Sequence, residues 1–282
     1  MDGHGIFETA VGVDLGGSKL LVRYRDRWLR QETGPGFDGE ALTAILRRFL
    51  DALDRPPAGL GVAVPGLVDG ATVVACDVLP GLAGWDIGQA LGARAPRRVL
   101  VNDAKAALHA TTAGLPPAAV AVTVMAGTAI GAGIVAGGGV LAGASGWAGE
   151  LGYWPVRGDA GEWLRLDQLA GGAFMAARLG IDGRTLAARA AAGDAGALAV
   201  VAEGGRALGG ALAGVVNLLN PQRLSIGGGA LRLPSYWTQA EAVLRAQAIA
   251  PMLAACDVRT VHTIEDLVAR GAACMASSPR TP

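Results

Sequence analysis

One local pattern occurs near the start of each half of this chain and restricts its possible folds. Residues 11–22 run from an apolar strand through Asp14 and a glycine turn into a second apolar run. Residues 120–135 repeat that order around a turn of small residues. β-branched residues favour strands, and glycine leaves room for a ligand beside the backbone. Two halves built on one plan predict a duplicated α/β fold around a central cleft.

Between and after these strand pairs, hydrophobic periodicity predicts further helices and strands. Apolar residues at helical spacing indicate an amphipathic helix over 40–53, and a helix of small residues follows over 105–113. The other helices are expected at about 87–91, 164–179, 184–190, 195–219, 235–249 and 265–276, and the other strands at 59–64, 72–75, 98–101, 223–226 and 258–261. The expected boundary lies at Gly114–Pro117, which gives a smaller domain over 1–115 and a larger one over 116–282.

Composition excludes several classes of protein. Lys and Arg total 24, and Asp and Glu also total 24, so the chain lacks the charge excess that nucleic-acid and membrane-surface binders use. Cys76, Cys256 and Cys274 form no C-x-x-C pair, so no disulfide framework or redox dithiol is predicted, and a cytoplasmic location is expected. Residues 106–149 contain no Asp, Glu, Lys or Arg, but prolines and glycines break this stretch into strand-length runs typical of a core.

The first glycine turn offers chemistry as well as shape. Gly16 and Gly17 permit positive φ and remove side chains, while Ser18 and Lys19 add a hydroxyl and an ammonium group. Such a turn can cradle phosphate, although neither a Walker loop nor a G-x-G-x-x-G motif is present. An ordinary strand–turn–strand with a solvated lysine explains the same residues equally well. The turn alone leaves both interpretations open.

Five regions, in order, carry a resemblance that spans about residues 10–276. They are VGVDLGGSK at 11–19, GVAVPGLVDG at 61–70, LVNDAKAAL at 100–108, GTAIGAGIV at 127–135 with GWAGELG at 146–152, and NPQRLSIGGGA at 220–230. Together they resemble the ROK family (repressors, open reading frames and kinases) of the actin/hexokinase-like ATPases. The resemblance implies two ribonuclease H-like α/β domains around a nucleotide cleft, with the last helix folding back toward the first domain.

The resemblance also implies a site for ATP and Mg²⁺. Asp14 matches the aspartate that is expected to hold the cation directly or through water. The phosphates are expected at Gly16, Gly17, Ser18 and Lys19 in the first turn and at Gly127, Thr128 and Gly131 in the second, and the adenine or ribose at Gly227, Gly228 and Gly229. Ala129 replaces the glycine usual in the second turn. It strains the turn if that position needs positive φ, and otherwise its methyl group only narrows the pocket.

Asp103 is the expected catalytic base, and Asn102 is expected to orient a neighbouring acceptor hydroxyl. A carboxylate held at the end of a buried strand can take the hydroxyl proton as the bond to phosphorus forms. Both residue types are also common helix caps, and Asn102 and Asp103 stand just before the predicted helix over 105–113. The capping and catalytic roles are compatible with each other.

The expected acceptor contacts depart further from the family pattern. Glu150 matches a hydroxyl-binding glutamate and Gly66 a turn beside the substrate, but Tyr153 stands at the acceptor position where the family has histidine. The cysteine loop that binds zinc in the family is missing, so no structural zinc is predicted. Glu162 and Asp167 are the candidates for the glutamate attached to that loop. These changes favour a modified acceptor, such as an amino- or deoxyhexose or a cyclitol, over glucose.

Three tryptophans, Trp147, Trp154 and Trp163, flank the Glu150 region. Large aromatic side chains are more often buried in a core than exposed as a platform for a sugar. We therefore expect them in the core, with a sugar platform as the alternative.

The sequence thus predicts an ATP-dependent kinase that phosphorylates the exocyclic hydroxymethyl group of a hexose-like sugar or cyclitol. The alternatives are a plain glucokinase, a kinase that uses polyphosphate, and an inactive sensor that binds sugar or nucleotide. A transcriptional regulator is disfavoured, because only ten residues precede Val11 and a helix-turn-helix needs more. The expected partners are a small sugar-like substrate and, as is usual in the family, a second copy of the chain; neither nucleic acid nor a membrane is expected.

Overall fold

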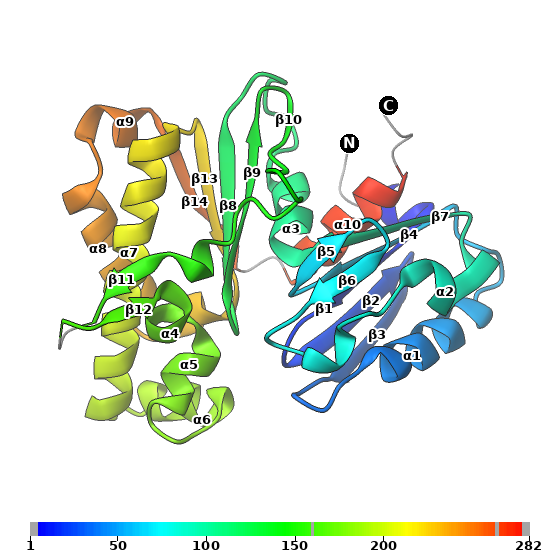
Figure 1. Cartoon of the computed structure of the whole chain (residues 1–282), viewed down its shortest axis with the longest axis horizontal. Coiled ribbons are helices and arrows are strands. Elements are labelled where there is room, and N and C mark those ends of the chain that lie inside the picture. The colour runs from blue at the N-terminus through cyan, green and yellow to red at the C-terminus, as the bar shows by residue number, and fades with distance from the viewer. Residues whose placement is uncertain (1–4, 159–160, 263–264, 278–282) are drawn as a thin grey trace. The chain divides into compact units, whose positions relative to one another are not determined.

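The computed structural model describes residues 5–158, 161–262 and 265–277, and the chain divides into two compact units (Figure 1). Unit 1 comprises Met1–Gly114, Ala142–Ala148 and Glu265–Pro282, and unit 2 comprises Leu115–Leu141 and Gly149–Ile264. The boundary expected between residues 115 and 116 lies one residue from the first of these limits. Nothing in the sequence indicated that residues 142–148 group with unit 1.

Unit 1 is built on a five-stranded mixed sheet in the order β3-β2-β1-β4-β7. Its strands are β1 (Ala10–Leu15), β2 (Lys19–Tyr24), β3 (Arg27–Glu32), β4 (Gly59–Val64) and β7 (Arg97–Asn102), and a separate hairpin joins β5 (Leu67–Asp69) to β6 (Thr72–Ala75). The first three strands form an antiparallel meander, and β4 and β7 run parallel to β1. The carboxyl ends of these three parallel strands therefore meet at one end of the sheet, where Asp14, Gly66 and Asn102 stand.

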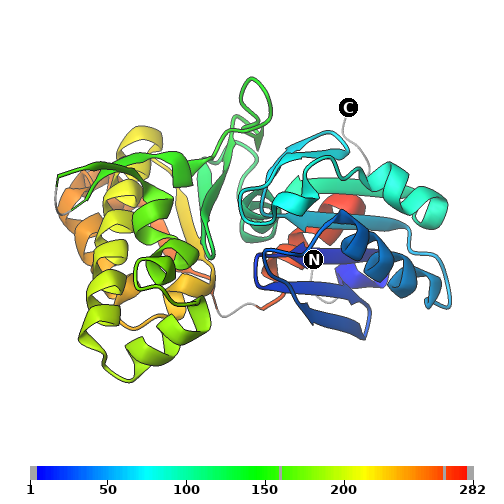
Figure 2. The ribbon, with the colours of Figure 1, turned by 60° about the horizontal axis from the view of Figure 1, so that its bottom comes forward.

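The two faces of this sheet are covered by different helices (Figure 1, Figure 2). The helices of unit 1 are α1 (Gly39–Asp51), α2 (Ile87–Leu91), α3 (Asp103–Thr111) and α10 (Leu267–Ser277), with short 3₁₀ turns η1 (Gly5–Glu8), η2 (Pro80–Leu82) and η3 (Gly92–Arg94). Val13 and Val62 pack into one core with Leu46 of α1 and with α2. Because side chains alternate along a strand, Gly61 faces the other way. A Cβ atom there would overlap the carbonyl oxygen of Ala272, so α10 lies with its backbone directly on the sheet.

Unit 2 repeats the plan of unit 1. Its sheet has the order β10-β9-β8-β13-β14, with strands β8 (Ala121–Ala126), β9 (Ile130–Ala136), β10 (Gly139–Val140), β13 (Arg223–Gly227) and β14 (Asp257–Thr260). Here too, three strands form an antiparallel meander and two run parallel to its last member in the sheet order, β8. This duplication confirms the predicted α/β fold with two ribonuclease H-like domains. A separate hairpin joins β11 (Pro155–Arg157) to β12 (Trp163–Arg165).

The helices of unit 2 match the predicted ones except over 164–179 and at α9 (Ala250–Ala255). They are α4 (Leu166–Ala170), α5 (Gly172–Ala177), α6 (Gly183–Ala191), α7 (Ala195–Leu219), α8 (Tyr236–Gln247) and α9, with 3₁₀ turns η4 (Leu151–Tyr153) and η5 (Gly229–Arg232). The single helix predicted over 164–179 is wrong, because β12, α4 and α5 occupy that stretch. Gly171 separates the two helices in extended backbone, with φ −72° and ψ 135°. The short helix α9 was not predicted.

Among the described residues, α7 is the one helix long and apolar enough to cross a membrane, judged by length and composition alone. Within its most apolar window, 61% of the helix is buried inside the structure. Leu208 and Leu212 belong to the core of unit 2, and the helix packs against α4 and α8. Burial in this core accounts for its apolar composition.

Candidate functional site

Asp14 lies near the end of β1 and is one of the few buried charged side chains, with 8% of its surface exposed. Burial raises the pKa of its carboxyl from the ordinary value of 3.8 to about 6, and the positive charge of Lys19 opposes that rise. The Lys19 Nζ atom lies 4.0 Å from the Asp14 carboxylate and is itself exposed. A carboxylate that is ionised at a cost to folding gains most from a bound cation.

The described residues suit magnesium at Asp14 only with help from a ligand. They contain no group of three or more His, Cys, Asp and Glu side chains that could hold a metal ion. Mg²⁺ commonly takes one or two carboxylates and completes its shell with water and substrate phosphates. A single buried carboxylate beside an exposed turn fits that pattern.

Asp14→Asn should stabilise the protein above pH 6 but not at pH 4. Because the folded-state pKa of Asp14 lies above its ordinary value, folding favours the protonated carboxyl. The free energy of unfolding of the wild type should therefore fall relative to the variant as pH rises from about 4 to about 6. The total change should be about 3 kcal/mol. Urea denaturation of both proteins across this range, without divalent cations, measures it. A difference that does not change with pH would contradict the burial of the charge.

The first glycine turn is held in place by its own backbone and by Thr33. Gly16 N–H donates to the Lys19 carbonyl at 2.8 Å, and the Thr33 hydroxyl donates to the Gly16 carbonyl at 2.7 Å. Neither Gly16 nor Gly17 uses the positive φ that glycine permits, so backbone conformation is not the reason for glycine here. The absence of a side chain does leave room beside the turn, since a Cβ atom on Gly16 would meet only the Lys19 carbonyl oxygen, at 3.5 Å. Thr33 was not anticipated, because it reaches this turn only through the pairing of β2 with β3.

The end of β7 and the start of α3 bring three predicted acceptor residues together. Asn102 caps α3, with its Oδ1 accepting the Ala104 N–H at 3.0 Å, and its Nδ2 donates to the Gly66 carbonyl at 3.2 Å. Asp103 follows in the first turn, where its Oδ1 accepts the same Ala104 N–H at 2.8 Å. The capping role is therefore present, and the cap also links Asn102 to the turn after β4.

Cys76 lies close to this group, although the sequence indicated no role for it. Its buried thiol donates to the Pro65 carbonyl at 3.2 Å. Burial raises the pKa of the Cys76 thiol, and the carboxylates of Asp103 and Asp77 add to that rise. The thiol therefore supports the Pro65-Gly66 turn as a neutral group. Glycine is required at Gly66, because a Cβ atom there would lie 2.5 Å from the Ala75 carbonyl oxygen.

The second glycine turn, in unit 2, is tied to the start of α5. The carbonyls of Gly127 and Thr128 accept the N–H groups of Gly172 and Ala173 at 2.8 and 3.1 Å. Ala129 does not have positive φ, so alanine causes no strain there and the narrowed pocket is the remaining alternative.

Gly131 differs from its predicted place. It lies within β9, opposite Met125 of β8, because the strand begins at Ile130, inside the stretch of small residues that was expected to form the turn. The sequence could not show this start, since small residues suit both a turn and a close-packed strand.

The three glycines at the end of β13 and directly after it have different reasons for being glycine. A Cβ atom on Gly227 would lie 2.8 Å from the Met125 sulfur, and one on Gly228 would overlap the Ala126 carbonyl oxygen. Gly228 also has φ +100°, a backbone angle that residues with a side chain rarely adopt. The Ala126 backbone therefore requires glycine at position 228, whereas at position 227 the Met125 side chain would have to move. Around Gly229, by contrast, no atom lies within 4 Å of a Cβ position, so this glycine leaves open space.

Glu150 directly precedes the short turn η4, and Tyr153 ends it. The Tyr153 N–H donates to the Glu150 carbonyl at 3.1 Å, and Glu150 is half-buried. The Tyr153 ring is 49% exposed and lies 4.7 Å from the Arg165 guanidinium. Of the two candidates for the missing glutamate, Glu162 is exposed, whereas Asp167 is buried and accepts the Ile130 N–H at 2.6 Å. Asp167 thus holds the start of β9 in place.

All three tryptophans expected in the core are exposed, so that prediction is wrong. Trp147, Trp154 and Trp163 are 38%, 46% and 67% exposed. Trp163 pairs across the β11–β12 hairpin with Arg157, whose guanidinium lies 5.0 Å from the indole ring. The three tryptophans lie in loops and in a short hairpin, and such segments have no hydrophobic periodicity from which burial could be predicted.

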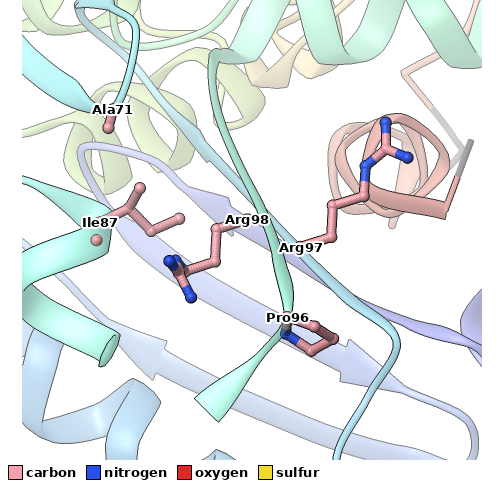
Figure 3. A pocket seen from close by; sticks show the side chains of 6 residues that line it. Ala71, Ile87, Pro96, Arg97 and Arg98 are labelled. Atoms are coloured by element: carbon pink, nitrogen blue, oxygen red, sulfur yellow. The ribbon is translucent and has the colours of Figure 1, made fainter. Parts of the chain in front are cut away.

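A cavity of about 420 Å³ in unit 1 lies away from these residues, at the start of β7 (Figure 3). It is lined by Ala71, Ile87, Gly88, Pro96, Arg97 and Arg98. Figure 3 shows Arg98 pointing toward Ile87 and Arg97 leaving the strand on its other side. Asn102 and Asp103 stand at the opposite end of the same strand, so this cavity is not part of the candidate site.

Comparisons with known proteins agree on one family. The sequence model of the ROK family matches residues 10–278. The ROK hexokinase from Thermus thermophilus is 26% identical, with 95% of this chain and 97% of that chain covered and a TM-score of 0.73. A ROK family glucokinase from Streptomyces griseus, solved with glucose and AMPPNP, is 21% identical, with 95% and 98% covered and a TM-score of 0.76. A ROK family transcriptional regulator, a homolog of the E. coli MLC protein, is 22% identical, with 93% and 76% covered and a TM-score of 0.72. No match was found among curated proteins.

Proposed function

The chain belongs to the ROK family, and from that premise we propose that it is a sugar kinase that uses ATP. It transfers the terminal phosphoryl group to the exocyclic hydroxymethyl group of a hexose-like acceptor. The observation that carries this proposal is the linked group at the end of β7, where Asn102 joins the Gly66 turn to the helix that begins with Asp103. The hexokinase and glucokinase structures similar to this chain support the same reaction class.

The proposed chemistry uses few protein groups, because phosphoryl transfer depends on positioning and charge stabilisation. The acceptor hydroxyl gives its proton to the Asp103 carboxylate as its oxygen bonds to the γ-phosphorus. The bond from that phosphorus to the bridging oxygen then breaks, and ADP leaves. One N–H of the Asn102 amide donates to Gly66, and the second N–H orients a neighbouring hydroxyl of the acceptor.

The nucleotide contacts are assigned to the two glycine turns and to Gly229. Asp14 would hold Mg²⁺ directly or through water, and Mg²⁺ when bound neutralises charge on the phosphates. The Lys19 ammonium is exposed at the end of the first turn, where it adds a positive charge. Thr128 offers a hydroxyl in the second turn.

The acceptor is proposed to be a modified sugar, such as an amino- or deoxyhexose, or a cyclitol. Support comes from Tyr153, whose exposed ring is paired with Arg165 at a position where the family resemblance implies histidine. The cysteine loop of the family is also missing, and the β11–β12 hairpin occupies that stretch of the chain. This second departure from the family pattern likewise favours a modified acceptor. A cytoplasmic homodimer is the expected form, on the basis of cysteine usage and of what is usual in the family.

Coupled ADP release tests the function. Mg-ATP and polyphosphate are each supplied with a panel of hexoses, aminohexoses and cyclitols. We expect turnover with ATP, and the highest kcat/KM with a modified acceptor. The highest value with glucose would overturn the acceptor proposal, and turnover with polyphosphate alone would overturn the donor. Nucleotide binding without turnover of any acceptor would indicate a sensor.

Gly229→Ala should raise the KM for ATP by about tenfold while leaving the fold intact. The added methyl group enters open space in the free protein, so any cost falls on the ligand, and a steric clash of about 1.4 kcal/mol gives this factor. Gly139→Ala is the matched control in unit 2, because its Cβ would also meet no atom. An unchanged KM for ATP in the Gly229 variant would place the nucleotide elsewhere.

A further inference from the structure

Residues 142–148, here called the strap, leave unit 2 and return to it, yet they group with unit 1. The Ala148 N–H donates to the Ala142 carbonyl at 3.0 Å and closes the strap into a loop. A Cβ atom on Gly146 would lie 3.8 Å from the Val68 carbonyl oxygen, in the strand that follows Gly66. The strap therefore sits beside the turn to which Asn102 is hydrogen-bonded.

Lys105 fastens the strap to the helix that carries Asp103. It is the third residue of α3, it is half-buried, and its Nζ donates to the Gly146 carbonyl. Partial burial of an ammonium group costs free energy unless the group is hydrogen-bonded. The bond to Gly146 offsets that cost, so it is favoured to remain formed. Lys105 thus connects the first turn of α3 with the residue just before Trp147.

Trp147 is held in the strap with 38% of its surface exposed. A loop fixed by hydrogen bonds that leaves an indole partly exposed provides a rigid aromatic face. Such a face packs against the apolar C–H face of a sugar or cyclitol ring, while the hydroxyl groups at the edge of that ring stay free to bond elsewhere. We propose that Trp147 contacts the acceptor ring and helps to determine specificity, and that Lys105 is a positioning residue that holds Trp147 there through Gly146. This inference rests on the proposed kinase function.

The chemical class that this face selects is a six-membered ring with a C–H face, as in a hexopyranose or a cyclitol. An open-chain polyol has the same hydroxyl groups but no rigid face to stack. The wild type should therefore prefer the ring acceptors of the panel to sorbitol, and removal of the indole should reduce that preference.

The test measures acceptor KM, ATP KM and kcat with the best ring acceptor of the panel. Trp147→Ala should raise the acceptor KM by about tenfold, the factor expected for loss of one well-packed aromatic contact. Trp147→Phe keeps an aromatic face and should stay within about threefold. The KM for ATP should not change. Trp163→Ala is the control, because Trp163 is also exposed but pairs with Arg157 in the hairpin.

Lys105 is tested through the same contact. Lys105→Met should raise the acceptor KM, whereas Lys105→Arg should keep it close to the wild-type value. The pH profile of kcat should be unchanged in both variants. If Lys105 acts through Trp147, the double variant Lys105→Met/Trp147→Ala should be no worse than Trp147→Ala alone. Multiplying effects in the double variant would overturn the positioning role.

The outcomes separate this inference from the proposed function. Normal wild-type turnover with an unchanged acceptor KM in Trp147→Ala overturns the inference and leaves the kinase function intact. Absence of turnover with every acceptor removes the function and the inference together. A raised acceptor KM in Trp147→Ala but not in Trp163→Ala supports the inference.

Discussion

Asp103→Asn should lower kcat by about a thousandfold, the size of effect expected when a general base is lost. The amide has nearly the same shape as the carboxylate, and its oxygen can still accept the Ala104 N–H that Asp103 accepts at 2.8 Å. Asn102 remains in place as the cap of α3. The variant should therefore fold normally, bind ATP with an unchanged KM, and lose only proton transfer. Coupled ADP release and a thermal unfolding curve measure the two properties.

Asp182→Asn is the matched control for this experiment. Asp182 caps α6 in unit 2, where its Oδ1 accepts the Thr185 N–H at 2.8 Å. The control changes the same chemical group at a helix start that has no predicted catalytic role, so kcat should stay within about twofold of the wild type. Equal kcat values for the Asp103 variant and the wild type would show that Asp103 is only a structural residue at the start of α3.

Gly61→Ala should destabilise the protein by about 3 kcal/mol or more, because the new methyl group collides with backbone rather than with a side chain that can rotate. It would overlap the carbonyl oxygen of Ala272, and Gly12 on β1 meets Ala269 of α10 in the same way. The variant can relieve the overlap only by lifting α10 from the sheet, which exposes Ala269 and Ala273 to water. Urea denaturation measures the loss.

Gly183→Ala is the control for Gly61→Ala. Gly183 is the first residue of α6, it lacks positive φ, and no atom lies within 4 Å of its Cβ position. Alanine there should be neutral or stabilise by about 0.5 kcal/mol, since it restricts the unfolded chain. If both variants unfold at the wild-type urea concentration, α10 is not seated on the glycine face of the sheet.

The magnesium role proposed for Asp14 implies a cost in stability. Its carboxylate is buried with its pKa raised to about 6, so near neutral pH the folded protein holds a charge that folding disfavours. Asp14→Asn should consequently stabilise the protein at neutral pH and abolish magnesium-dependent turnover. Stabilising substitutions at strained functional positions commonly have this cost.

The sequence alone determined the duplicated α/β plan, because local patterns carry that information. Apolar, β-branched runs around a turn of small residues occur at 11–22 and at 120–135, and this repeat predicted the strand pair that begins the sheet of each unit. The same local patterns placed Asp14 near the end of one predicted strand and Asn102 directly after another. These statements depend on residues close together in the chain, whose spacing is visible in the sequence.

Only the tertiary structure decided the features that depend on segments distant in sequence. The Lys105–Gly146 hydrogen bond joins residues 41 positions apart, and it ties the residue before Trp147 to α3. The same is true of Gly228, which is glycine because the Ala126 carbonyl lies where its side chain would be, whereas Gly229 faces open space. A glycine looks the same in the sequence in both cases. Steric exclusion and loop anchoring arise from the neighbours that folding supplies, so no local period could have revealed them.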